Sequence, residues 1–159
     1  MSDDRRQYFE RYTAAWNEHD PEAVAEQFAP GGTYVDPAVG DPIRGPEVGE
    51  FVAETVRGFP NVRFEERRVV TVDEGDELVL VAEWTMHGTH AGPFDGLPPT
   101  GNEVALDGVD VVTISDDGIT SITGYFDQRA FTAQLGLTFP AVLGQVPTLA
   151  LGAVRQALA

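Results

Sequence analysis

The sequence has 159 residues, which fits one domain of ordinary size. It contains 26 Asp and Glu residues against 10 basic residues, all of them Arg, so its formal net charge is −16. Nucleic acids and anionic membrane surfaces are bound through Lys and Arg, and we therefore expect neither as a partner. Cysteine is absent, which excludes disulfides and thiolate metal sites.

The acidic excess without lysine is typical of proteins adapted to concentrated salt, where ions screen the repulsion between carboxylates. A GC-rich genome that favours Arg codons is the alternative explanation. The first residues lack the basic and apolar segments of a secretory signal, and no apolar run reaches the ~18 residues of a membrane span. We therefore expect a cytoplasmic protein.

Helical patterns fill the first third of the chain. Residues 2–4 can cap a helix whose apolar stripe holds Tyr8, Tyr12 and Trp16 at helical spacing. Asp20 then caps a short second helix with Pro21 at its first position. After a short strand at residues 33–36, Gly45-Pro46 opens a third helix that ends near residues 58–60.

Strand patterns follow. They cover residues 62–72, 78–90, 104–115 and 119–126, with turns at 73–76 and 116–118 and a Gly/Pro-rich loop at 91–101. A short helix at 127–135 comes next, and the apolar tail 138–159 is expected to be helical only in part. Helices first and four long antiparallel strands second predict an α+β domain, in which helices pack on the concave face of a curved sheet.

Alternation along the strand 78–90 places Trp84, Met86 and His90 on its more apolar face, which is the better candidate for the concave side. His87 falls on the other face and is expected to meet solvent. His90 is therefore the candidate pocket histidine. A hydrogen-bonded structural histidine at a strand end is the alternative.

In the last strand, alternation pairs Tyr125 with Asp127 on one face. A carboxylate at the end of a pocket-lining strand can be desolvated, which raises its pKa and suits proton transfer. Asp127 can instead act as the N-cap of the helix that follows, and the two roles do not strictly exclude each other.

Other polar residues give weaker signals. Tyr34 could donate a hydrogen bond to a substrate carbonyl, whereas Asp36 precedes Pro37 and is expected to form a turn. Asp107 and Asp110 lie on opposite faces of the strand 104–115, and Asp110 could approach the pocket. Three histidines without regular spacing predict no metal site.

Several segments together resemble the SnoaL-like polyketide cyclases, over roughly residues 5 to 137. The most specific stretch runs from Trp84 to Gly101. The other similar segments are Trp16-Asn17-Glu18-His19-Asp20, Phe28-Ala29-Pro30, Tyr34-Val35-Asp36-Pro37, Asp117-Gly118-Ile119, Tyr125-Phe126-Asp127 and Gln134-Leu135-Gly136. The segments are weak singly, but their order and spacing are fairly specific.

The resemblance implies the cone-shaped fold of nuclear transport factor 2-like and ketosteroid isomerase-like proteins, commonly a homodimer through the sheet. It also implies aldol cyclisation without metal or organic cofactor, acting on a small hydrophobic, polyketide-like or steroid-like ligand. The essential acid of the family corresponds to Asp127 and its pocket histidine to His90. We expect Trp84, Tyr125, Tyr34, Met86, Trp16 and Tyr12 to contact the substrate.

Two questions stay open at this level. The same pocket could serve a non-catalytic protein that only binds a small molecule, because the fold alone does not determine function. The tail 138–159 lies outside the resemblance, and it could cover the sheet, the pocket mouth or a partner subunit.

Overall fold

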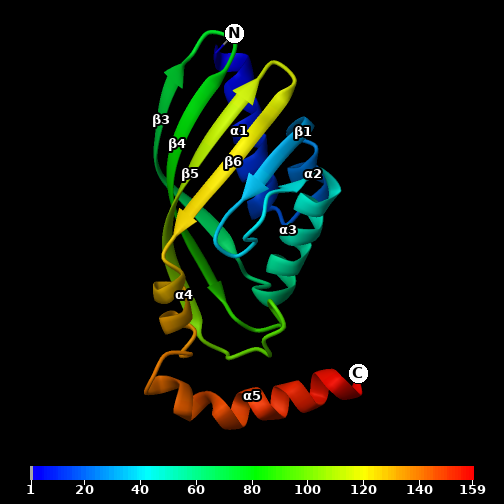
Figure 1. Cartoon of the computed structure of the whole chain (residues 1–159), viewed down its shortest axis with the longest axis vertical. Helices are drawn as coiled ribbons and strands as arrows, with labels where there is room; N and C mark the ends of the chain where they lie inside the picture. Colours follow the sequence, from blue (N-terminus) through cyan, green and yellow to red (C-terminus); the bar gives the residue numbers. More distant parts are fainter. Residues whose placement is uncertain (1) are drawn as a thin grey trace.

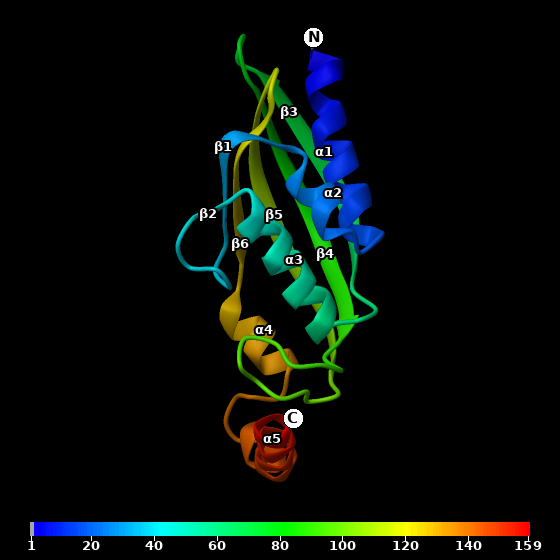
Figure 2. The same cartoon turned by 90° about the vertical axis from the view of Figure 1, so that its right-hand side faces the viewer.

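The computed structural model describes residues 2–159 and shows one curved sheet with helices against its concave face (Figures 1 and 2). The helices are α1 (Ser2–Asn17), α2 (Pro21–Ala25), α3 (Pro46–Gly58), α4 (Gln128–Gln134) and α5 (Ala141–Leu158). The strands are β1 (Phe28–Val35), β2 (Ile43–Arg44), β3 (Arg63–Asp73), β4 (Leu78–Thr89), β5 (Glu103–Ser115) and β6 (Gly118–Phe126). The predicted α+β class is confirmed.

The strand order in the sheet is β2-β1-β6-β5-β4-β3. The four long strands form antiparallel neighbours, as expected. Short turns join β3 to β4 and β5 to β6, whereas the longer loop 91–101 lies between β4 and β5. The strand predicted at residues 33–36 is longer than expected, because β1 begins at Phe28 and pairs in parallel with β6. This pairing places β1, the strand that follows α1 and α2, directly beside β6 in the sheet.

The core has two parts along the length of the sheet. One lies between α1, α3 and the concave face, and it includes Tyr12, Trp16 and Val52. The other lies toward α4 and includes Phe59, Met86 and Leu135. No helix among residues 2–159 has both the length and the apolar character needed to cross a bilayer.

A β-bulge changes which side chains of β6 face inward. The register between β5 and β6 shifts between Thr113 and Ile114, and both Ile119 and Ile122 are fully buried. Beyond the bulge the concave face therefore carries Ile122, Gly124 and Phe126. The expected alternation through the whole strand is wrong for this reason, and Tyr125 lies on the outer face with 58% of its surface exposed.

The tail forms a single helix, α5, although Pro147 lies inside it. It lies beyond α4 at one end of the molecule, below the loop 91–101 (Figures 1 and 2). Gly152 approaches Pro98 so closely that a Cβ at this position would overlap the proline ring. Much of the apolar surface of α5 is exposed, including Leu143, Val146, Leu151, Val154 and Leu158.

Candidate active site

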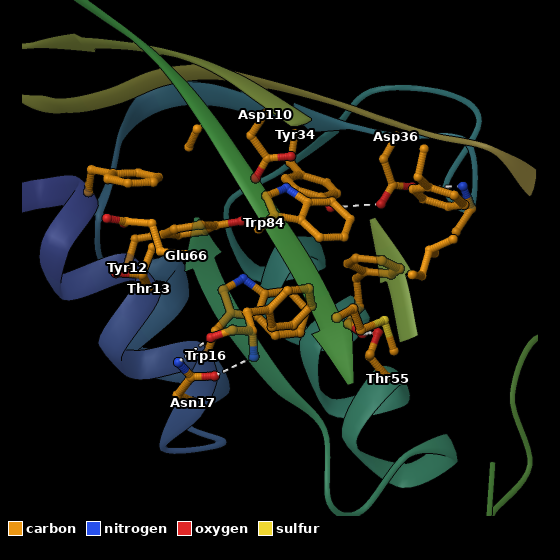
Figure 3. Close-up of a pocket in the computed structure, with 18 of the residues that line it drawn as sticks. Tyr12, Thr13, Trp16, Asn17, Tyr34, Asp36, Thr55, Glu66, Trp84 and Asp110 are labelled. Carbon is orange, nitrogen blue, oxygen red and sulfur yellow. Dashed lines mark hydrogen bonds between the residues drawn. The ribbon is translucent and has the colours of Figure 1, made fainter. Parts of the chain in front are cut away.

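A cavity of about 250 Å³ lies between the concave face of the sheet, α1 and α3 (Figure 3). Most of its lining is aromatic or aliphatic. The residues that line it are Phe9, Tyr12, Thr13, Trp16, Asn17, Tyr34, Asp36, Ala38, Phe51, Thr55, Phe64, Glu66, Ala82, Trp84, Met86, Phe94, Leu106, Asp110, Phe126 and Phe131. An apolar cavity with a few polar groups is the usual form of a small-molecule site.

Five of the six residues expected to contact substrate lie in this lining: Trp84, Tyr34, Met86, Trp16 and Tyr12. Trp84 and Met86 are on the face of β4 that alternation selected. Trp16 and Tyr12 come from the inward stripe of α1, which packs across the sheet (Figure 3). Their contact with a ligand stays a prediction.

Asp110 is one of the two buried carboxylates of the cavity, the other being Asp36. It lies in the middle of β5 on the concave face, and only 9% of its surface is exposed. The pKa of its carboxyl group is raised to about 7, chiefly by desolvation on burial and also by the negative charge of Asp36, while the Trp84 indole N–H acts in the opposite direction. A carboxyl group with a pKa near neutrality can both accept and return a proton.

Asp36, the second buried acid, has its oxygens engaged. Its Oδ2 accepts a hydrogen bond of 2.7 Å from the Tyr34 hydroxyl, and its Oδ1 accepts bonds from the amides of Ala38 and Val39. The expected turn is therefore present, and the same side chain also lines the cavity. The two acids differ in that Asp36 has three donors, whereas no comparable set reaches Asp110.

Two glycines make room for this arrangement. Gly124 pairs with Asp110 in the sheet, and a Cβ added to it would lie 3.0 Å from Asp110 Oδ1 and 3.0 Å from Asp36 Cβ. Gly108 pairs with Trp84, whose indole lies so flat over it that a Cβ would overlap the ring. The absence of side chains at these positions lets the acids and the indole share one end of the cavity.

Two further groups can donate hydrogen bonds in the cavity, the Tyr12 hydroxyl and the Trp84 indole N–H, because the Tyr34 hydroxyl already donates to Asp36. Burial raises the pKa of Tyr12 and of Tyr34 well above the ordinary value, so both hydroxyls stay protonated. Trp84 Nε1 is buried without a partner at hydrogen-bonding geometry, and it lies toward Asp110 (Figure 3). The same N–H favours the ionised form of Asp110, so it can serve a ligand oxygen only beside that carboxyl group.

Asp127 lies outside the cavity lining. It is the N-cap of α4, and its Oδ1 accepts hydrogen bonds from the amides of Arg129 at 2.8 Å and Ala130 at 3.2 Å. The capping alternative is therefore confirmed, and Tyr125 beside it points away from the cavity. A catalytic role for Asp127 stays a prediction, since capping alone does not exclude it.

His90 is fully buried, but it does not line the cavity either. Its ring stacks on Phe59, and its Nδ1 accepts a hydrogen bond from the Thr100 amide. Desolvation lowers the pKa of His90, which favours a neutral imidazole. These contacts fit the alternative of a structural histidine at a strand end.

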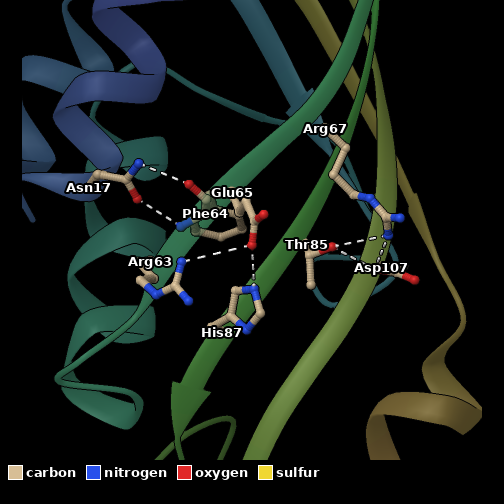
Figure 4. A network of polar contacts seen from close by, with 8 residues as sticks. All are labelled: Asn17, Arg63, Phe64, Glu65, Arg67, Thr85, His87 and Asp107. Atoms are coloured by element: carbon tan, nitrogen blue, oxygen red, sulfur yellow. Dashed lines mark hydrogen bonds and ion pairs between the residues drawn. The ribbon is translucent and has the colours of Figure 1, made fainter.

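The outer face of the sheet carries a separate polar network (Figure 4). Asp107 accepts hydrogen bonds from Thr85 and Arg67. His87 lies on the same outer face, where its ring contacts the carboxyl group of Glu65. Asp107 and Asp110 thus lie on opposite faces, as the strand period predicted. In residues 2–159 no group of three or more His, Asp or Glu side chains could hold a metal ion.

The chain is similar in sequence to one protein family and in fold to several solved structures. A sequence model described as SnoaL-like polyketide cyclase matches residues 6–135. No curated protein shows significant sequence similarity to the chain.

Solved structures share the fold. AclR from Streptomyces galilaeus, a candidate hydroxylase, is 20% identical with a TM-score of 0.70, covering 87% of this chain and 99% of AclR. IdmH from Streptomyces antibioticus, a candidate polyketide cyclase, is 25% identical with a TM-score of 0.65, covering 83% and 98%. A protein from Catenulispora acidiphila with a ketosteroid isomerase-like fold, in complex with trimethylamine, is 26% identical with a TM-score of 0.63, covering 85% and 95%.

Proposed function

Because this chain belongs to the SnoaL-like polyketide cyclase family, we propose that it catalyses acid/base chemistry on a small hydrophobic carbonyl compound, with Asp110 as the proton-transfer group. The observation that carries the proposal is the environment of Asp110. It is a nine-tenths-buried carboxyl group in an aromatic cavity, beside a second carboxyl group whose oxygens are already engaged. Titratable pairs with separated environments commonly divide acid and base roles.

The proposed reaction is an intramolecular aldol cyclisation. Ionised Asp110 removes a proton from the carbon next to a carbonyl group, and an enolate forms. The enolate carbon then attacks a second carbonyl carbon of the same molecule, so that a C–C bond forms while the C=O π electrons move to oxygen. Protonated Asp110 returns its proton to the resulting alkoxide. The pKa of about 7 suits both transfers.

Negative charge that develops on the substrate oxygen needs donors. Tyr12 stays protonated, and the Trp84 indole N–H has no partner at hydrogen-bonding geometry, whereas the Tyr34 hydroxyl already donates to Asp36. These groups are fixed by packing before the substrate arrives, which is the arrangement that stabilises an oxyanion most effectively. The surrounding rings exclude water and restrict how a flat substrate can lie.

The second candidate function is binding without turnover, which requires the cavity but no titrating group. The aromatic lining supports it as well as it supports catalysis. The prediction that Asp127 and His90 are catalytic also stays to be tested against Asp110. A single set of variants can separate the three possibilities.

The test measures exchange of α-protons for deuterium in 1-tetralone, a two-ring ketone chosen to suit the modest cavity, by proton NMR in D₂O. Asp110→Asn should lower the enzyme-dependent exchange rate by about 10²–10⁴, the usual contribution of a positioned acid/base. Asp107→Asn is the matched control, because it makes the same change on the outer face of the same strand, and it should retain the wild-type rate.

Two outcomes would contradict the proposal. Loss of exchange in Asp127→Asn or His90→Gln, with Asp110→Asn active, would favour the sequence-based assignment. Absence of exchange in the wild type, together with an increase in Tm on adding 1-tetralone that survives Asp110→Asn, would favour a binding protein.

A further inference from the structure

We propose that the cavity selects a positively charged ring compound, one that carries an amine beside its rings, over neutral and anionic compounds of the same shape. The inference deepens the proposed function, since it names the charge class of the ligand at that same site. It goes beyond acid/base catalysis, because it concerns recognition and holds whether or not turnover follows.

The first support is the sign of the charges around the cavity. Its lining contains the three acids Asp36, Glu66 and Asp110, and among residues 2–159 no Arg or His contributes to it. The three arginines directly next to lining residues in the sequence have partners elsewhere: Arg11 bonds to Gln27, Arg63 pairs with Glu65, and Arg67 bonds to Asp107 on the outer face. A bound anion would meet like charges with no basic partner, which is costly where water is excluded.

The second support is the arrangement of the rings. Trp16 and Phe64 meet at 65° with centroids 5.1 Å apart, and Phe64 and Trp84 meet at 79° with centroids 5.5 Å apart. All three rings line the cavity, and each is steeply inclined to the next. Such aromatic cages attract cations, because the faces of the rings carry partial negative charge.

The third support is the position of the acids along the cavity. Asp110 lies deep and has no basic partner, whereas Glu66 is exposed and pairs with Trp84 at the β3–β4 edge of the lining. A cation held by the rings would supply the counter-charge that burial denies Asp110. The other polar groups that face Asp110 are Asp36 and Tyr34 from the β1 side, Tyr12 from α1 and Trp84 from β4.

Coupling between ligand charge and Asp110 gives a distinctive signature. In the free protein the carboxyl group has a pKa of about 7, and a bound cation would lower it by stabilising the ionised form. Cation binding therefore releases a proton, so affinity rises as the pH rises through this range. Between about pH 6 and about pH 8 the expected gain is about tenfold, by linkage with a group of that pKa.

Isothermal titration calorimetry with three probes that share one ring system tests the proposal. These are 2-naphthylmethylamine, 2-naphthylmethanol and 2-naphthoate, measured at constant ionic strength at both pH values. The amine should bind at least about tenfold more tightly than the alcohol at the higher pH, a difference typical of one well-placed charge interaction, and naphthoate should bind most weakly. In Asp110→Asn the preference for the amine and its pH dependence should shrink, while Asp107→Asn should keep both.

The three titrations of the wild-type protein test the charge selection even if a variant fails to fold. Equal or tighter binding of the alcohol or of naphthoate would overturn the proposal, and so would the absence of binding by all three probes. The result is independent of the exchange assay: a clear amine preference without proton exchange would remove the proposed catalysis and keep the charge selection.

Discussion

The buried carboxyl group of Asp110 predicts an unusual dependence of stability on pH. Its pKa is about 7 in the folded protein, against an ordinary value of 3.8. Between these values the folded state holds the proton and the unfolded state does not, so stability falls as pH rises through this window and levels off above about 7. At ~1.4 kcal/mol per pH unit, the loss over the whole window is about 4 kcal/mol.

Urea unfolding of the wild type and of Asp110→Asn at a series of pH values measures the contribution of Asp110 to stability. This contribution is the difference between the free energies of unfolding of the two proteins at each pH. The useful range begins near pH 5.5, because the sequence pI of about 4.3 favours association at lower pH. From there to about pH 8.5, the stability of the wild type relative to the variant should fall by about 2 kcal/mol. Asp107→Asn, at an outer position with 71% of the side chain exposed, should show no such loss.

The reasoning is refuted if the difference between wild type and Asp110→Asn stays constant over this range, or if it changes in the opposite direction. A constant difference would mean that Asp110 keeps an ordinary pKa. Water or a counter-charge would then reach the carboxyl group, and its value as a proton-transfer group near neutral pH would be lost.

Four further outcomes are expected. Gly124→Ala should lower exchange activity about tenfold or more, because the added Cβ would push Asp110 and Asp36 apart. The exchange assay measures this loss, and circular dichroism should show little change in fold. Gly108→Ala should weaken ligand binding by displacing Trp84, and quenching of indole fluorescence can report it. Moving from about 0.2 M to about 3 M NaCl should raise the Tm by about 5 °C or more if the net charge of −16 reflects salt adaptation, and an unchanged Tm would count against it. Light scattering should give twice the 17.2 kDa chain mass if the expected homodimer forms, and an unchanged mass after truncation at residue 137 would remove the tail from that interface.

Much of the fold was predictable because its signals are local. Strand period, turns and helix caps predicted the four long strands and the concave face of β4, on which Trp84 and Met86 line the cavity. The parallel pairing of β1 with β6 was not predictable from pattern, because it joins segments about ninety residues apart. Contacts at that separation leave no periodic signal in the chain.

The candidate site was harder to predict than the fold. The two-residue period of a strand predicts that Tyr125 and Asp127 face inward. The bulge in β6 instead places Tyr125 on the outer face, and a bulge of this kind has no reliable sequence signature. Strand alternation places Asp110 on the face opposite Asp107, but a single acid in a strand is weak evidence of a catalytic site. Its significance depends on the desolvation of its carboxyl group by burial, which only the tertiary structure reveals.

The two acids of the cavity differ because of where each lies along its strand. Asp36 follows the last residue of β1, where the chain turns back and the free amides of residues 38 and 39 reach its carboxyl group. Asp110 lies in mid-strand, where pairing with β4 and β6 uses the backbone donors of its neighbours. The turn after β1 therefore supplies amide donors to one carboxyl group, whereas the sheet backbone supplies none to the other. If so, adding a donor beside Asp110, as in Ala82→Asn at its partner position on β4, should lower its pKa, and a ¹³C NMR titration of that carboxyl group can measure the shift.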